Sequence, residues 1–299
     1  MLERTCIQEM VLSLKEAEQA EQVARRFSEE AYTTDFERYD CALRERLSEL
    51  PESLSRVAQT FGNNFGSAGI VRISGLPVQQ DLPPTPTVPY SEIRLPTGTE
   101  PLVLAVAMLM GHPLSVKGWR GGDRVQNIYP LPADAQTMKA SGAVRLAMHT
   151  EATFRPGAPD ALVLLCLRAG SLPPQTGFCD LLPLLDQLEA SERSLLAEPA
   201  FGFRKPDGDF FERKPIVASS EGQLRFQYDG NLHSTTPEHA KALGALTERI
   251  EASTTETTLA PGELLLIDNR HMAHSRTQFA PRFDGTDRWM QRCLIQARS

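Results

Sequence analysis

The sequence lacks a cysteine framework. Its five cysteines, Cys6, Cys41, Cys166, Cys179 and Cys293, are odd in number and widely spaced, and no two form a Cys-x-x-Cys pair. Disulfide scaffolds use even, closely spaced sets, and structural zinc sites use paired cysteines. We therefore predict reduced thiols, no cysteine zinc site and a cytoplasmic location.

Long apolar segments are also absent. The longest apolar run, Leu102–Met110, covers nine residues, whereas about 20 are needed to span a bilayer. The first 15 residues mix charged and apolar side chains, without the continuous apolar core of a targeting signal. We expect no membrane partner.

Positive charge is in deficit. The chain has 31 Lys and Arg against 38 Asp and Glu, a net charge of −7. A net acidic surface repels phosphate backbones, so we expect no nucleic-acid partner. Of the 299 residues, 41% are hydrophobic and 23% are charged. These proportions are ordinary for a globular protein and exclude a disordered chain.

Helical patterns come first along the chain. Residues 13–31 and a segment from Pro51 to Gly62 have apolar side chains at helical spacing. The run 70–73 is typical of a buried strand, and residues 77–101 hold seven prolines, which predicts irregular structure.

Short β-like runs dominate from residue 124 onward. Two segments with helical spacing, 181–197 and one opening at Thr236-Pro237, interrupt them. This order predicts one domain with a β-sandwich or open barrel that helices buttress. The runs are 125–129, 144–149, 161–167, 223–228, 263–268 and 289–296.

The triplet His149-Thr150-Glu151 follows one of these runs. Side chains two residues apart on a strand point to the same face, so His149 and Glu151 would face one cavity and could share a metal. The alternative is an ordinary hydrogen-bonded histidine beside a surface glutamate, since short motifs often match by chance.

A second imidazole follows the apolar run 264–267, where His271 and His274 are the candidates. Two histidines and one carboxylate form the facial triad of non-haem Fe(II) oxygenases, which leaves positions open for co-substrate and oxygen. Spacing alone does not choose between His271 and His274.

The C-terminal run places Arg288 and Arg292 on one strand face with apolar residues. Buried guanidinium groups need partners, and bound carboxylates are the best match. The alternative is an edge strand with both arginines in water.

An ordered set of motifs resembles the clavaminate synthase-like group of the taurine dioxygenase superfamily. That group contains Fe(II)/2-oxoglutarate enzymes, among them arginine and asparagine hydroxylases of antibiotic pathways. The motifs run from about residue 65 to the end. They include Met148-His149-Thr150-Glu151, Asp268-Asn269-Arg270 with His274-Ser275-Arg276, Arg282-Phe283-Asp284-Gly285-Thr286-Asp287-Arg288-Trp289, Val125-Gln126-Asn127-Ile128-Tyr129-Pro130 and Leu224-Arg225-Phe226-Gln227-Tyr228-Asp229.

The resemblance implies a role for particular residues. It selects His274 over His271, so that His149, Glu151 and His274 hold Fe(II), with O2 as a further co-substrate. Thr176, in a turn of residues 175–177, and Arg288 would anchor the distal carboxylate of 2-oxoglutarate.

The resemblance also implies a substrate site. Arg292 would bind the α-carboxylate of an amino acid, and Glu151 or Gln126 would lie near its amine. Asp229 and Asn231 would belong to a lid. Relatives often carry a second acid where Asn231 stands, so a doubly gripped guanidinium is not expected here.

The resemblance implies a mainly β fold with flanking helices and a double-stranded β-helix (jelly-roll, cupin-like) core. Residues 1–299 would form one domain, with a helical part at about 1–65 and the core, with helical and lid insertions, at about 66–299. The expected enzyme hydroxylates a free polar or basic L-amino acid, or desaturates or cyclises it, in a specialised-metabolite pathway. A zinc hydrolase with the same His, Glu and His, or a non-catalytic jelly-roll binding protein, is the alternative. The oligomeric state and the amino acid itself do not follow from the sequence.

Overall fold

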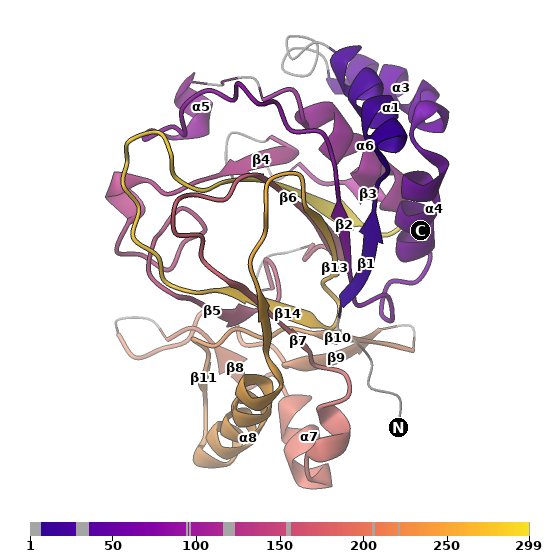
Figure 1. The fold of residues 1–299 in the computed structure, drawn as a ribbon. Helices are drawn as coiled ribbons and strands as arrows, with labels where there is room; N and C mark the ends of the chain where they lie inside the picture. The colour runs from indigo at the N-terminus through magenta and orange to yellow at the C-terminus, as the bar shows by residue number, and fades with distance from the viewer. Residues whose placement is uncertain are drawn as a thin grey trace.

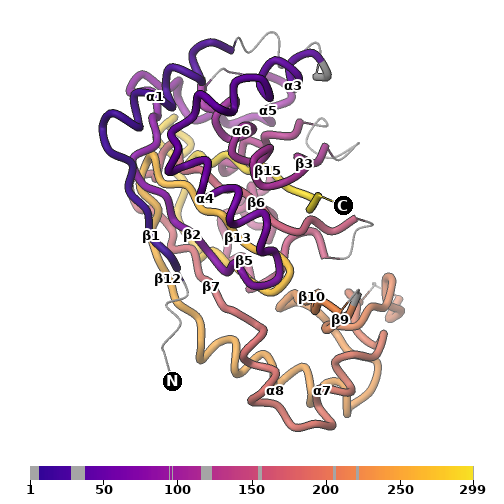
Figure 2. The backbone as a smooth tube through the Cα atoms, turned by 90° about the vertical axis from the view of Figure 1, so that its right-hand side faces the viewer, coloured from indigo at the N-terminus to yellow at the C-terminus, as the bar shows by residue number. Residues whose placement is uncertain are grey.

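The computed structural model describes residues 7–27, 36–93, 95, 97–115, 123–153, 157–204, 207–220 and 222–298. Two β-sheets face each other, and helices cover the outer side of each (Figures 1 and 2). Within these residues no helix combines the length and the apolar character that crossing a membrane requires.

The larger sheet has the strand order β1, β2, β13, β6, β15 and β3, and β4 also pairs with β15. Its strand pairs are antiparallel except for β1 with β2. The bounds are β1 (Ile7–Val11), β2 (Ile70–Ser74), β3 (His112–Pro113), β4 (Val125–Ile128), β6 (Ala161–Arg168), β13 (Leu264–Asp268) and β15 (Trp289–Gln296).

Strand β6 shows why the central strands read as continuous apolar runs. Val163 and Leu165 pack toward the helices, whereas Leu162 and Leu164 pack toward the second sheet. Because successive side chains alternate between faces and both faces are buried, every position from Ala161 to Leu167 is apolar.

The smaller sheet has the strand order β12, β7, β14 and β5, all antiparallel. Phe178 of β7 and Met272 of β14 pack against Leu164 and Met290 of the larger sheet, so the two sheets share one interior. The bounds are β5 (Leu146–His149), β7 (Thr176–Asp180), β12 (Thr255–Thr257) and β14 (Met272–Arg276).

Helices α1 (Leu14–Arg25), α3 (Phe36–Glu45), α4 (Glu52–Gly62) and α6 (Glu100–Met110) cover the outer face of the larger sheet (Figure 1). Every residue of α6 is buried. The short elements α5 (Tyr90–Ile93), η1 (Leu47–Glu49) and η3 (Pro132–Asp134) lie in connections.

Helices α7 (Ala190–Leu196) and α8 (Pro237–Ser253) lie at the opposite end of the molecule, beside the smaller sheet (Figure 2). The short 3₁₀ helix η4 (Leu185–Gln187) precedes them. Two short strand pairs lie in the same region, β8 (Phe201–Gly202) with β11 (His233–Ser234) and β9 (Val217–Ser220) with β10 (Gln223–Phe226).

Several sequence predictions need correction. Residues 7–11 form an edge strand, so the part predicted as helical contributes to the larger sheet. Only 185–187 and 190–196 of the predicted helix 181–197 are helical. Helix α1 ends at Arg25, and residues 28–31 of that prediction lie outside the described residues.

The strand predictions at 70–73, 161–167, 263–268 and 289–296 are confirmed within one or two residues. The four described cysteines, Cys41, Cys166, Cys179 and Cys293, are free thiols as predicted. Cys6 lies outside the described residues.

Candidate active site and metal centre

His149 and His274 are direct cross-strand neighbours. His149 ends β5, His274 lies in the middle of β14, and the two residues pair in the antiparallel register. Their ring centroids are 4.4 Å apart. The prediction that the second imidazole meets the first across a sheet is therefore confirmed for His274.

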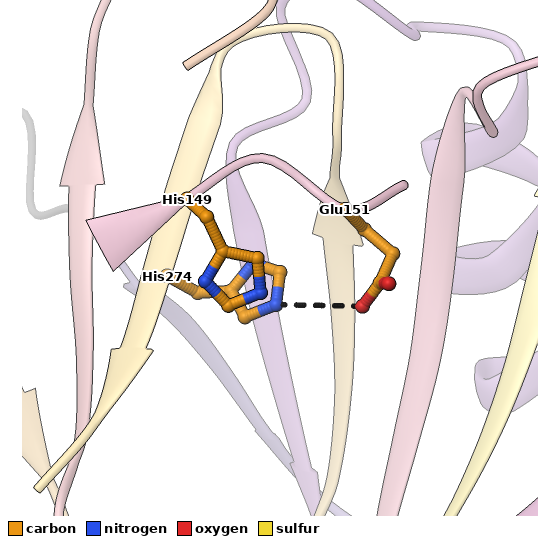
Figure 3. Close-up of side chains that lie close together, drawn as sticks. All are labelled: His149, Glu151 and His274. Atoms are coloured by element: carbon orange, nitrogen blue, oxygen red, sulfur yellow. Dashed lines mark ion pairs between the residues drawn. The ribbon is translucent and has the colours of Figure 1, made fainter. Parts of the chain in front are cut away.

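Glu151 faces both rings (Figure 3). One ligand atom from each of His149, Glu151 and His274 lies within 4.8 Å of the others. The strand argument for Glu151 is wrong, however, because β5 ends at His149 and Glu151 lies in the following turn. The turn nonetheless brings the carboxylate to the histidines.

The protonation of the histidines suits metal binding. Burial, and then the proximity of His149, lower the pKa of His274 to about 3, so this ring is neutral at physiological pH. His149 Nδ1 donates to the carbonyl of Ala147 at 2.8 Å, which leaves the Nε2 lone pair for a ligand. His274 Nε2 lies 3.8 Å from Glu151 Oε2, beyond hydrogen-bond distance. Two imidazoles and a carboxylate are a ligand set that fits Fe(II).

His271 lies outside this cluster. Its Nδ1 is 2.8 Å from Asp180 Oδ1, and its Nε2 is 3.3 Å from Asp268 Oδ2. Burial lowers the pKa of His271, but the neighbouring carboxylates of Asp180 and Asp268 outweigh burial and raise the pKa to about 9. A charged imidazole between two carboxylates is a structural bridge.

A cavity of about 330 Å³ opens between the sheets at the three clustered side chains. Most of the residues predicted for the site line it, but His271 and Gln126 do not. The predicted residues on its wall are His149, Glu151, Thr176, Asp229, Asn231, His274, Arg288 and Arg292.

Arg288 lies half-buried on the cavity wall, just before β15. It makes no hydrogen bond or ion pair with any residue that the structure describes. Desolvation lowers its pKa to about 10, so the guanidinium stays charged at neutral pH. A half-buried cation on a cavity wall, with no partner among the described residues, can bind an anion.

Thr176 is the first residue of β7 and not part of a turn, which corrects the sequence prediction. It pairs in register with Arg276 of β14. Both residues line the cavity, as does Arg288.

Arg276 is a residue that the sequence analysis left without a role. Its Nη1 and Nη2 donate to the carbonyls of Ala140 and Val144 at 3.1 and 2.7 Å. Burial, and then the charge of Arg288, lower its pKa to about 9. The available signal was its position two residues after His274, which puts both side chains on one strand face.

Arg292 and Gln126 are cross-strand partners on β15 and β4. Gln126 Oε1 accepts hydrogen bonds from Arg292 Nε at 3.2 Å and Nη2 at 2.8 Å. Arg292 Nη1 forms an ion pair with Glu151 Oε2. Gln126 therefore orients the arginine that contacts the clustered carboxylate.

The segment 229–231 crosses the cavity beside His149. Asp229 forms an isolated bridge with His149, and Gly230 N donates to the carbonyl of Met148 at 2.9 Å. Asp229 Oδ1 accepts two hydrogen bonds from Asn231, from the backbone N at 2.8 Å and from Nδ2 at 2.9 Å. Asn231 thus occupies one oxygen of the Asp229 carboxylate.

Comparison with known proteins places the chain in a family. The family model of the taurine catabolism dioxygenase TauD, TfdA family matches residues 105–294. L-asparagine oxygenase of Streptomyces coelicolor is 31% identical over 303 residues, which cover 96% of this chain and 89% of that protein. L-lysine 3-hydroxylase of Catenulispora acidiphila is 31% identical over 306 residues, which cover 96% of this chain and 84% of that protein.

A solved structure gives the same result. Asparagine oxygenase in complex with Fe(II), 2S,3S-3-hydroxyasparagine and succinate superimposes with a TM-score of 0.86 and 29% identity, covering 97% of this chain and 93% of that chain. These relatives are oxygenases and a hydroxylase. They support neither alternative that the residues alone left open, a zinc hydrolase or a non-catalytic binding protein. The chain belongs to the TauD, TfdA family and is an Fe(II)/2-oxoglutarate-dependent dioxygenase.

Proposed function

We propose that this dioxygenase hydroxylates a free polar or basic L-amino acid. The observation that carries the proposal is one cavity whose wall holds the His149, Glu151 and His274 cluster, two arginines for two carboxylates, and the Asp229-Asn231 pair. The similarity to an L-asparagine oxygenase and an L-lysine 3-hydroxylase supports this substrate class.

His149, Glu151 and His274 would hold Fe(II). The neutral state of His274 and the open Nε2 of His149 support this assignment, because metal ligands must be deprotonated. When bound, Fe(II) with 2-oxoglutarate and O2 supplies the oxidative decarboxylation and the oxygen transfer. The chain contributes the geometry and a site shielded from water.

Arg288 and Thr176 would anchor the distal carboxylate of 2-oxoglutarate. The half-buried guanidinium of Arg288, which has no partner among the described residues, is the supporting observation, since a carboxylate can accept two parallel hydrogen bonds from it. Arg276, beside Thr176 on the neighbouring strand, adds a second positive charge that favours a dianion.

Arg292 would bind the α-carboxylate of the amino acid, with its guanidinium oriented by Gln126. Glu151 lies within contact of Arg292 and so close to the expected position of the α-amine. Gln126 uses its carbonyl oxygen on Arg292, so its proposed role shifts from the amine to the orientation of Arg292.

The Asp229-Asn231 pair would select the distal end of the side chain. One Asp229 oxygen already accepts two hydrogen bonds from Asn231. A guanidinium fork needs both oxygens, whereas an ammonium, amide or ureido group needs one. We therefore propose lysine-, ornithine-, citrulline- or glutamine-like substrates, with arginine second.

The fold and the setting are part of the same proposal. We infer a double-stranded β-helix core, supported by the two facing antiparallel sheets, within a single oxygenase domain spanning 1–299. A cytoplasmic location and a specialised-metabolite pathway stay predictions.

The experiment is a substrate panel. The Fe(II)-loaded protein is incubated with 2-oxoglutarate, O2 and each common amino acid, ornithine or citrulline, and mass spectrometry scores products that gain one oxygen or lose two hydrogens. Amino acids with an ammonium, amide or ureido end should couple succinate formation to product. Leucine or glutamate as the best-coupled substrate would contradict the proposal.

Two variants test the lid within the same panel. Asp229→Ala should uncouple the best substrate, and Asn231→Asp should move the preference toward arginine because it adds a second carboxylate. Asp207→Ala is the matched control, since Asp207 accepts a backbone hydrogen bond from Asp209 in the same local pattern but lies outside the cavity. Unchanged coupling in Asp229→Ala would contradict the proposed role of Asp229 in substrate selection, but not the proposed iron site.

A further inference from the structure

Glu151 is not held by a strand, although both histidines of the cluster are. Strand β5 ends at His149, and Glu151 lies in the turn that follows. The next residue, Ala152, has a φ of 53°, in the left-handed region that residues with a side chain avoid. Such a backbone persists only where the surroundings hold it in place.

The side chain of Asn269 holds this turn. The backbone N of Glu151 donates to Asn269 Oδ1 at 2.6 Å, and Asn269 Nδ2 donates to the carbonyl of Glu151 at 3.0 Å. Asn269 Nδ2 also donates to the carbonyl of Pro159 at 2.9 Å. One planar amide therefore pairs with both backbone groups of Glu151, as a neighbouring strand would.

Asn269 itself is fixed to the larger sheet. It directly follows Asp268, the last residue of β13, and only 2% of it is exposed. Asp268 Oδ2 accepts from the backbone N of Gly66 at 2.6 Å, and Arg270 Nε donates to Asp160 Oδ1 at 2.8 Å. The Asn269 side chain thus fixes the turn that contains Glu151 relative to strand β13.

We propose that Asn269 is a positioning residue that sets the Fe(II) affinity of the site through the backbone of Glu151. The inference rests on the proposed role of Glu151 as an iron ligand. Asn269 is neither one of the clustered ligands nor a residue that lines the cavity, so it acts only by fixing the peptide groups from which the Glu151 side chain extends. This role would also explain why asparagine stands at the centre of the Asp268-Asn269-Arg270 motif.

Asn269→Ala removes both hydrogen bonds to Glu151. Loss of an outer-shell partner typically weakens metal binding about tenfold to a hundredfold, and we expect a loss of that size in the Fe(II) dissociation constant. Asn269→Asp keeps an acceptor for the Glu151 N–H but turns a carboxylate oxygen toward the carbonyls of Glu151 and Pro159, so it should also weaken Fe(II) binding. The aspartate variant also decides the question if the alanine variant does not fold.

The matched control is Thr97→Val. Thr97 is fully buried, donates to Glu100 at 2.7 Å and accepts from Gln291 at 2.8 Å, on the side of β15 that faces away from the cavity. Its loss removes buried hydrogen bonds of similar number far from Glu151. It should lower the melting temperature and leave the Fe(II) affinity of the folded protein unchanged.

The experiment measures anaerobic Fe(II) binding to each full-length variant, together with its melting temperature. Weaker Fe(II) binding in the Asn269 variants, with unchanged binding in Thr97→Val, supports the inference. Fe(II) affinity at the wild-type level in the Asn269 variants, or an equal loss in Thr97→Val, overturns it. Glu151→Ala separates the two claims, because retained Fe(II) affinity there would instead contradict the proposed ligand set.

Discussion

Two buried histidines only three residues apart differ in their charge state. Burial keeps His274 neutral, with a pKa of about 3, whereas two aspartates keep His271 protonated, with a pKa of about 9. A neutral imidazole can bind a metal, and an imidazolium cannot. The environment of each ring thus favours His274 over His271 as the proposed ligand.

The first prediction follows from this difference. His274→Ala should lose Fe(II) binding and turnover, because it removes one of the three proposed ligands. His271→Ala should keep Fe(II) binding in the protein that remains folded. Anaerobic Fe(II) titration of both variants checks this. If His274→Ala bound Fe(II) with the affinity of the wild-type protein, the proposed ligand set would be wrong.

Arg288 carries the second prediction. Arg288→Ala should raise the 2-oxoglutarate requirement far more than the amino-acid requirement, because this cation on the cavity wall has no other described partner. Loss of one member of a buried charge pair costs about 2 kcal/mol or more, which is about thirtyfold or more in the dissociation constant.

Arg292→Ala is the control for Arg288, since it should raise the amino-acid requirement instead. Initial rates at varied 2-oxoglutarate and varied substrate separate the two effects. Equal sensitivity of both requirements in Arg288→Ala would rule out its role as the co-substrate anchor.

At the scale of secondary-structure elements, His271 joins the two sheets. It contacts Asp180, the last residue of β7 in the smaller sheet, and Asp268, the last residue of β13 in the larger sheet. Because its folded-state pKa of about 9 lies above the ordinary value of 6.5, protonation stabilises the folded state. This stabilisation is complete below pH 6.5 and is lost as the pH rises through about 9.

The third prediction is therefore a fall in the free energy of unfolding between pH 6.5 and about 9, by up to ~3 kcal/mol. The His271→Gln variant should be less stable at pH 6 and should show a flatter profile over this range. Denaturant unfolding at several pH values measures both. A wild-type profile that matches that of His271→Gln would contradict the bridge.

The elements differ in how far sequence could predict them. Strands β6 and β13 are buried on both faces, so each appears as a nearly continuous apolar run. Helix α6 gives the same signal, because it too is buried all round, and periodicity cannot separate a buried helix from a strand. Strands β7 and β14 are short and partly polar because they line the cavity, which hides their pattern.

The site shows the same limits. The approach of His274 to His149 follows from strand pairing, and the resemblance selected the register. Glu151 lies in the cluster because of a turn that Asn269 holds. The hydrogen bond that holds this turn joins residues 118 positions apart. Local spacing contains no information about such a contact.

At the scale of the whole molecule, the chain is acidic, whereas arginines gather at the cavity. The chain carries a net charge of −7, yet Arg276, Arg288 and Arg292 meet in one cavity between the sheets. A concentration of one sign in a low-dielectric cleft raises the local concentration of the opposite charge. The acidic exterior therefore does not conflict with binding a dicarboxylate inside.

We propose that His149, Glu151 and His274 hold Fe(II) in the same cavity in which Arg288 binds 2-oxoglutarate. An anaerobic visible spectrum of the Fe(II)-loaded protein, titrated with 2-oxoglutarate, tests both roles at once. We expect a weak absorption band that saturates at one 2-oxoglutarate per protein, is absent in His274→Ala and needs far more 2-oxoglutarate in Arg288→Ala. No band in the wild-type protein at saturating 2-oxoglutarate, or an unchanged band in His274→Ala, would contradict it.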